Sequence, residues 1–406
     1  MRDPLPPCVE AVALLNGLGA EDRVLHIAQD ERGAEALAVF LRGVLPDRRV
    51  FHLPQWDCLP FDGASPTPDA MGRRMAVLHA IADARPGDIV VAALPVLLQR
   101  LPPRDALRHF RVGVGQHLDL PALEAFVREA GYVSDDRVDE AGEIAIRGAT
   151  IEVFAGGNAL PCRIELADGA VASLRCYDPV TQRSTGDIET LDLVPVTELP
   201  PTGEPWERGA EHRLPRAWDV GLTILPDHLP GARITALPAT LESAERRLAR
   251  LADARAEAEA DGARPLPVDA LYLGPRDWAD LAARIDPLAE PDWSALPAFA
   301  AADRPRARLA DFLSGDGAAG RRLVLIAGDR AQQARVARVI EQADGQAPQR
   351  VAGWADCRDH ARAILLSDLA QGAVCGDLVV VTAQDLLGSR AASPGSRQVQ
   401  ALGACR

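Results

Sequence analysis

The chain has 406 residues, enough for two to four domains, and its content of 48% hydrophobic and 25% charged residues is typical of globular proteins. No apolar run is long enough to cross a bilayer and the first residues do not form a signal peptide, so we expect a cytoplasmic protein without a membrane partner. The net charge of −14 disfavours non-specific DNA binding, and seven scattered cysteines predict neither disulfides nor a zinc site.

All 44 basic residues are arginine, because the chain contains no lysine. A P-loop needs a lysine to reach the β- and γ-phosphates of a nucleotide, and Schiff-base chemistry needs a lysine amine. We therefore expect no cofactor, no ATP binding and no ATPase activity.

The first 93 residues predict alternating strands and helices. Short apolar runs of buried-strand length occur at Val24–Ala28, Val50–Leu53 and Ile89–Ala93, separated by helical apolar spacing at 33–44 and 71–84. This βαβαβ order is typical of a parallel sheet covered by helices. A further helix is predicted over 119–130.

Residues 131–185 alternate between apolar and polar, as a half-buried antiparallel sheet does. The alternation predicts that Arg147, Arg163 and Arg175 share the solvated face. Arginine is well suited to pair with carboxylates or phosphates of a partner. The alternative is that the arginines only solvate the sheet, or that Arg147 and Arg163 pair with Glu143 and Glu165.

Proline-rich residues 199–203 mark the next predicted boundary. Strands are expected at 222–225, 234–237 and 270–273, with a long helix over 241–260 that is capped by Thr240 and stopped at Gly262. A last α/β unit is expected from a strand at 321–327, a helix at 331–342 and a strand at 377–382. Residues 391–406 are expected to be a disordered tail.

No catalytic or metal-binding arrangement is predicted. The eight histidines lack metal-ligand spacing, so His26, His52, His79, His109 and His117 are expected in core or surface roles. The acidic residues at 135–136 and 139–140 are expected to form a solvated turn, because they lack the glycine-punctuated loop of a calcium site.

Two blocks of sequence carry a family resemblance. The first contains Arg147-Gly148, Pro161-Cys162-Arg163-Ile164-Glu165-Leu166, Ser173-Leu174-Arg175 and the run 177–185, YDPVTQRST. It resembles the second domain of the bacterial transcription-repair coupling factors (the Mfd family) and, more distantly, that of UvrB. The second block, LPQWDCLPFD at 53–62 followed by Ser65-Pro66, Arg74 and Leu78, is similar to the family signature LPxWExLPYD…SP…R…L.

The resemblance implies a fold and a domain order. A degenerate RecA/UvrB-like parallel-sheet α/β domain would comprise residues 1–115 and 200–290. A sheet-rich α+β UvrA-interaction domain at 116–199 would interrupt it, and a small α/β domain at 291–390 would follow.

The resemblance also implies a non-catalytic adaptor of nucleotide excision repair that docks UvrA through Arg147, Arg163, Ala167 and Arg175. Ala167 stands where the family usually has a phenylalanine, which implies weakened binding. The alternative is that the chain is the front end of a complete coupling factor, which is an ATP-dependent DNA translocase, because no motor motif occurs in the chain itself. In that case only the longer protein would reach RNA polymerase and damaged DNA. A nucleotide-binding regulator is a weaker third possibility.

Overall fold

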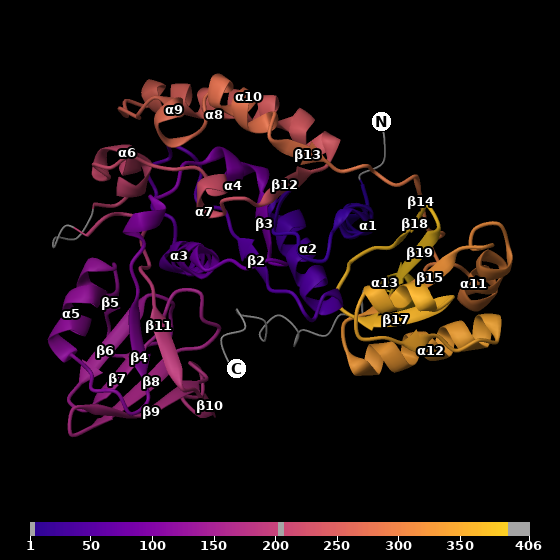
Figure 1. The fold of residues 1–406 in the computed structure, drawn as a ribbon, viewed down its shortest axis with the longest axis horizontal. Helices are drawn as coiled ribbons and strands as arrows, with labels where there is room; N and C mark the ends of the chain where they lie inside the picture. Colours follow the sequence, from indigo (N-terminus) through magenta and orange to yellow (C-terminus); the bar gives the residue numbers. More distant parts are fainter. Residues whose placement is uncertain (1–4, 202–206, 389–406) are drawn as a thin grey trace.

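The computed structural model describes residues 5–201 and 207–388, which fold into a central parallel sheet, a strand-rich lobe and a second α/β unit (Figure 1). This confirms the predicted α/β fold class. The predicted tail at 391–406 and part of the boundary at 199–203 lie outside the described residues. Within these residues, none of the helices combines the length and the hydropathy that a membrane span requires.

Five parallel strands form the central sheet in the order β13-β12-β1-β3-β2. Every residue of β1 and β3 is buried, as expected for a sheet covered on both faces. The strands are β1 (Val24–Ala28), β2 (Val50–Leu53), β3 (Ile89–Ala93), β12 (Arg233–Ala236) and β13 (Ile285–Pro287). The predictions for the first three are confirmed. Two of the five strands come from sequence beyond the strand-rich lobe, so the chain completes this sheet only after leaving that lobe.

Helices surround this sheet, and their starts follow ordinary capping chemistry. Asp30 caps α2 by accepting from the Gly33 amide, and Thr67 caps α3 before a proline in the first turn. The elements are α1 (Pro7–Gly17), α2 (Glu31–Val44), α3 (Pro68–Ala82), α4 (Leu94–Leu98), η1 (Arg104–Ala106), η2 (Ala210–Arg213), α6 (Leu214–Ala217), α7 (Leu225–His228), α8 (Pro238–Ala260), α9 (Val268–Leu271) and α10 (Pro275–Ala282).

Three expectations for this region are wrong. Residues 222–225 and 270–273 are not strands: each makes one isolated bridge, Thr223 to Leu101 and Tyr272 to Gln99, beside the short helices α7 and α9. A mostly apolar segment of four residues fits either structure, and Pro226 lies in the first turn of α7. Thr240 does not cap α8, since Pro238 opens that helix and Leu237 is its N-cap residue.

The strand-rich lobe has a six-stranded sheet in the order β10-β9-β8-β7-β6-β5, a two-stranded sheet of β4 and β11, and one helix (Figure 1). Its apolar side chains, including Ile144, Ile164 and Leu174, form a cluster distinct from the one that contains β1. The elements are β4 (Phe110–Gly113), α5 (Leu120–Glu129), β5 (Val133–Ser134), β6 (Glu143–Arg147), β7 (Thr150–Val153), β8 (Cys162–Ala167), β9 (Ala170–Tyr177), β10 (Ser184–Asp187) and β11 (Thr190–Leu193).

The second α/β unit has a mixed sheet in the order β14-β18-β19-β15-β17-β16. One side of it shares a core with the central unit, where Phe40 packs edge-on against Trp354 and the Ser367 hydroxyl donates to the Phe40 carbonyl. The domain boundaries stay predictions. The elements are β14 (Trp293–Ala295), α11 (Pro305–Ser314), β15 (Arg322–Ala327), α12 (Arg330–Asp344), β16 (Gln349–Arg350), η3 (Ala355–Asp359), β17 (Arg362–Leu366), β18 (Ala373–Cys375), β19 (Leu378–Thr382) and α13 (Ala383–Leu387).

Candidate functional site

One face of the lobe's main sheet carries the three arginines singled out in the sequence. Cross-strand pairing aligns Glu152 of β7 with Arg163 of β8, Arg163 with Arg175 of β9, and Arg175 with Asp187 of β10. Arg147 of β6 pairs with Thr150, two residues from Glu152 on the same strand. Because side chains two residues apart point to the same side of a strand, all three arginines lie on one face, as predicted.

Arg163 is held firmly on this face. Its Nε and Nη2 both donate to Glu152 Oε1, at 2.8 and 2.6 Å, and its guanidinium lies 5.0 Å from the centre of the Tyr177 ring. Glu152 is buried, with only 8% of its surface exposed. A buried carboxylate needs a charged partner, so Arg163 stabilises the sheet itself.

Arg147 and Arg175 are held more loosely. Arg147 Nη1 lies 3.6 Å from Glu152 Oε2, and half of its side chain is exposed. Arg175 donates to Asp187 Oδ1 at 3.2 Å and lies 3.9 Å from Glu165 Oε2, with 45% of its side chain exposed. Exposed pairs of this kind contribute little stability, so both guanidiniums retain donors for another molecule.

The pairing partners differ from the expected ones. Arg175 approaches Glu165, whereas the Glu143 carboxylate accepts from the backbone amides of Asp139 and Glu140. Glu152, which no sequence motif singled out, accepts hydrogen bonds from Arg163 and forms a longer ion pair with Arg147. Its position between Ile151 and Val153 in an alternating strand was the available signal.

Ala167 ends β8 at a two-residue hairpin. Asp168 and Gly169 both have positive φ, at 52° and 79°, which is the backbone of a tight primed turn. Ala167 is exposed, and it lies two residues beyond Glu165 on its strand. A larger side chain at this position would therefore project from the surface without disturbing the lobe's core.

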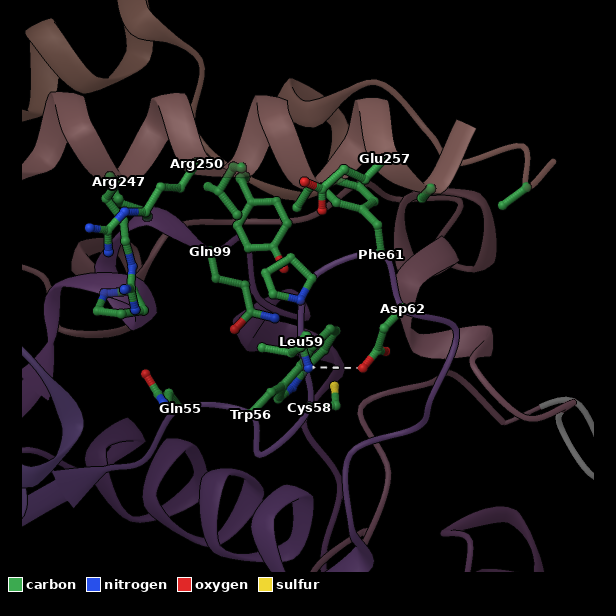
Figure 2. A pocket seen from close by; sticks show the side chains of 18 of the residues that line it. Gln55, Trp56, Cys58, Leu59, Phe61, Asp62, Gln99, Arg247, Arg250 and Glu257 are labelled. Atoms are coloured by element: carbon green, nitrogen blue, oxygen red, sulfur yellow. Dashed lines mark hydrogen bonds between the residues drawn. The ribbon is translucent and has the colours of Figure 1, made fainter. Parts of the chain in front are cut away.

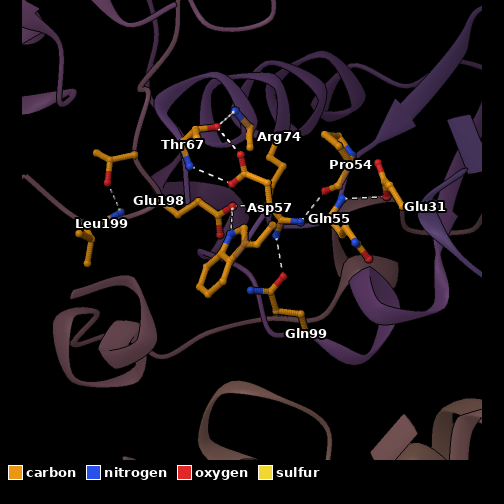
Figure 3. A network of polar contacts seen from close by, with 12 residues as sticks. Glu31, Pro54, Gln55, Asp57, Thr67, Arg74, Gln99, Glu198 and Leu199 are labelled. Carbon is orange, nitrogen blue, oxygen red and sulfur yellow. Dashed lines mark hydrogen bonds and ion pairs between the residues drawn. The ribbon is translucent and has the colours of Figure 1, made fainter. Parts of the chain in front are cut away.

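The second sequence block forms the joint between the lobe and the central unit (Figure 3). Arg74 of α3 and Glu198, which follows the lobe, form a fully buried ion pair. Arg74 also donates to the Pro54 carbonyl at 2.7 Å and to Gln99 Oε1 at 3.1 Å, and Trp56 Nε1 donates to Glu198 Oε1 at 3.1 Å. The residues of the signature-like block therefore fix the place where the chain returns from the lobe.

A cavity of about 620 Å³ opens beside this joint, between the loop after β2 and helix α8 (Figure 2). Trp56, Phe61 and Tyr272 supply apolar walls, and Arg247 and Arg250 of α8 lie at one end. Cys58 and Asp62 lie on the wall formed by the loop.

Other polar residues that the sequence offered as candidates make contacts within the fold. His26 lies in β1, between Thr235 Oγ1 at 3.0 Å and Glu10 Oε1 at 3.1 Å. His79 and His109 stack with ring centres 4.3 Å apart. In the acidic turn, Arg137 pairs with Asp139 at 2.9 Å.

Comparison with known proteins identifies this lobe. Residues 110–199 match the family model of the UvrB interaction domain. The transcription-repair-coupling factor of Escherichia coli is 33% identical over 156 residues, which is 38% of this chain and 14% of that protein. Those of Myxococcus xanthus and Mycobacterium tuberculosis are 31% and 27% identical over 186 and 268 residues, or 44% and 56% of this chain.

The chain spans 14–22% of the length of these three relatives. The matched region contains the arginine face. Over roughly two fifths to one half of its length the chain is thus similar to the transcription-repair-coupling factors, and its residues 110–199 match the UvrB interaction domain.

Proposed function

We propose that this chain is a non-catalytic adaptor of transcription-coupled nucleotide excision repair, which docks UvrA through the arginine face of its lobe. Support comes from the match of residues 110–199 to the UvrB interaction domain, together with the exposed guanidiniums on that face. A role in the cytoplasm, where bacterial DNA is repaired, would follow from this function.

Arg147 and Arg175 would contact the partner, while Arg163 would position the face. The face carries three arginines against Glu152, Glu165 and Asp187, so its charges balance. Recognition would therefore depend on the placement of individual charged groups rather than on a general positive field. Arginine pairing with partner carboxylates provides the direction and strength that such placement needs.

The absence of lysine supports the non-catalytic part of the proposal, because the phosphate-binding lysine of an ATP-dependent motor has no counterpart here. The short coverage of the relatives favours a second candidate, in which these residues serve as the front part of a longer coupling translocase. Sequencing the DNA downstream of codon 406 distinguishes the two. The same face would dock UvrA in either case.

Titration of cognate UvrA with single variants tests the docking face. We expect Arg147→Ala to weaken binding by about tenfold or more, since truncating an arginine that is a hot spot of an interface costs about 2 kcal/mol or more. Ala167→Phe should strengthen binding, because it adds an exposed aromatic group beside the arginines. Arg163→Ala should weaken binding and also lower the stability of the lobe, since it removes both hydrogen bonds of the buried Glu152 and leaves only the longer contact with Arg147.

Arg335→Ala is the matched control, because Arg335 is exposed on α12, outside the lobe. Equal UvrA affinities for the wild type, Arg147→Ala and Ala167→Phe would remove the proposed face.

A further inference from the structure

Three side chains with metal-binding atoms meet at the joint described above. Cys58 and Asp62 come from the loop after β2, and His212 comes from η2, which follows the lobe. His212 Nε2 lies 3.9 Å from Cys58 Sγ and 3.6 Å from Asp62 Oδ1, and the three ligand atoms all lie within 4.8 Å of one another. Atoms bound to one zinc ion at 2.0–2.3 Å are themselves about 3.3–3.8 Å apart, so small side-chain movements complete the geometry.

The surroundings of these atoms are negatively charged. Asp57 accepts hydrogen bonds from the Thr67 amide and hydroxyl, and Glu211 accepts one from the Ser65 hydroxyl. These donors are neutral, so they leave the carboxylate charges in place. Burial and the nearby Asp62, Asp57 and Glu211 raise the pKa of the Cys58 thiol to about 12. A divalent cation would reverse this effect, because it stabilises the thiolate and offsets the carboxylates.

The two ring nitrogens of His212 have different surroundings. Its side chain is 8% exposed, and Nε2 donates to the Ala64 carbonyl at 2.8 Å. The buried Nδ1 has no hydrogen-bond partner among the described residues. Moving the ring proton to Nδ1 gives up the bond to Ala64 and frees the Nε2 lone pair, and a turn of the ring then directs that lone pair toward an ion between Cys58 and Asp62.

We propose that Cys58, Asp62 and His212 bind a Zn²⁺ ion. One sulfur, one nitrogen and one carboxylate oxygen form a donor set that suits zinc, whereas Ca²⁺ and Mg²⁺ prefer oxygen ligands alone. Cys58 and Asp62 also line the cavity (Figure 2), so a water molecule from the cavity can take the fourth position of the ion. Binding releases the thiol proton to the buffer.

The ion would join two segments that are 150 residues apart in the sequence. The loop at 58–62 precedes the lobe and η2 follows it, so zinc would clamp the joint beside the buried pair of Arg74 and Glu198. A ligand that binds only the folded chain raises its stability. The site is independent of the proposed docking of UvrA.

Metal binding by the full chain tests this proposal. The apo chain, prepared with a chelator under reducing conditions, is titrated with ZnCl₂ by calorimetry and with CoCl₂ by absorption spectroscopy. We expect one ion per chain and a thiolate-to-cobalt charge-transfer band. Cys58→Ser should abolish that band, and Asp62→Asn should weaken binding about tenfold or more.

Cys176→Ser is the matched control, because the thiols of Cys176 and Cys162 lie 3.5 Å apart in the lobe and are an alternative thiol pair for metals. This variant should bind zinc as the wild type does. Circular dichroism checks each fold. Asp62→Asn is nearly the same size and keeps one side-chain oxygen, which can accept from the Ala64 or the Leu59 amide, so it removes less of the loop's hydrogen bonding than a truncation and gives a second test if Cys58→Ser unfolds. Absence of the cobalt band in the wild type, unchanged binding by Asp62→Asn, or loss of binding in Cys176→Ser would overturn the proposal.

Discussion

Arg147 and Arg163 approach the same carboxylate, that of Glu152, but their environments give them different tasks. Arg163 makes two short bonds to Glu152 and lies over Tyr177, so its geometry is fixed before any partner arrives. Arg147 is half exposed and lies 3.6 Å from the same group. Arg163 therefore positions the face, whereas Arg147 can contact a partner.

His228 gives a prediction at the same scale. It is buried in α7, and its Nε2 lies 3.1 Å from Thr223 Oγ1. Burial lowers the pKa of His228 from 6.5 to about 4, against a smaller opposing effect of the Pro102 carbonyl. Between these values the unfolded chain binds a proton that the folded chain does not. The contribution of neutral His228 is therefore complete above pH 6.5 and declines by up to about 3 kcal/mol as the pH falls toward 4.

Urea unfolding at pH 7 and at pH 5 measures this effect. His228→Gln should lose less stability between the two pH values than the wild type does. His117→Gln, which alters an exposed histidine of the lobe, should behave like the wild type. A pH dependence in His228→Gln as steep as that of the wild type would show that His228 is not the responsible group.

Among the helices and strands, the two-residue period of side chains along a strand is what allows part of the site to be predicted from the sequence. Alternation places Arg147, Arg163 and Arg175 on one face because successive side chains of a strand point to opposite sides. It does not show that Glu152 faces Arg163, since that pairing depends on the length of the connection between β7 and β8.

The same reasoning could not predict the structure of short segments or the pairing of residues that are far apart in the sequence. Residues 222–225 and 270–273 were wrongly expected as strands, because a mostly apolar segment of four residues is too short for its periodicity to distinguish a strand from a helix. Glu198 and His212 carry no local signal, since their partners Arg74 and Cys58 lie more than 120 residues earlier in the chain. Metal-ligand spacing within a single segment therefore could not indicate the site that we propose.

The contact between α3 and the loop after β7 gives a prediction for elements. A Cβ atom on Gly156 would lie 2.4 Å from the Gly72 Cα atom, and one on Gly72 would lie 2.6 Å from the Gly156 Cα atom. These neighbours are backbone atoms, which cannot rotate away. Gly156→Ala should therefore push the lobe from α3 and lower the free energy of unfolding by about 1–3 kcal/mol.

Gly186→Ala is the control for this change, because Gly186 lies in the same lobe and a Cβ atom there meets nothing within 4 Å. Its free energy of unfolding, measured in denaturant, should stay within about 0.5 kcal/mol of the wild type. Equal stabilities for the two variants would mean that the close approach of Gly72 and Gly156 does not hold the lobe in place.

In the whole molecule, buried contacts hold the lobe where it joins the central unit. The chain leaves the central unit after β3, builds the lobe, and returns through Glu198 to complete the central sheet with β12 and β13. The buried contacts of Arg74, Trp56 and Gln99 meet at that return point. On the other side, the second α/β unit shares a core with α1 and α2, so the lobe projects from a base of two units that pack together.

Our central claim is that the arginine face of the lobe is the surface that binds UvrA. The most direct test compares the UvrA affinity of the double variant Arg147→Ala/Arg175→Ala with that of Arg335→Ala/Arg338→Ala. Both variants lose two exposed arginines, and the second pair lies on α12 of the other α/β unit. We predict that the first double variant binds UvrA about 30-fold more weakly than the wild type, while the second keeps wild-type affinity. Equal affinities for the two double variants would contradict the claim.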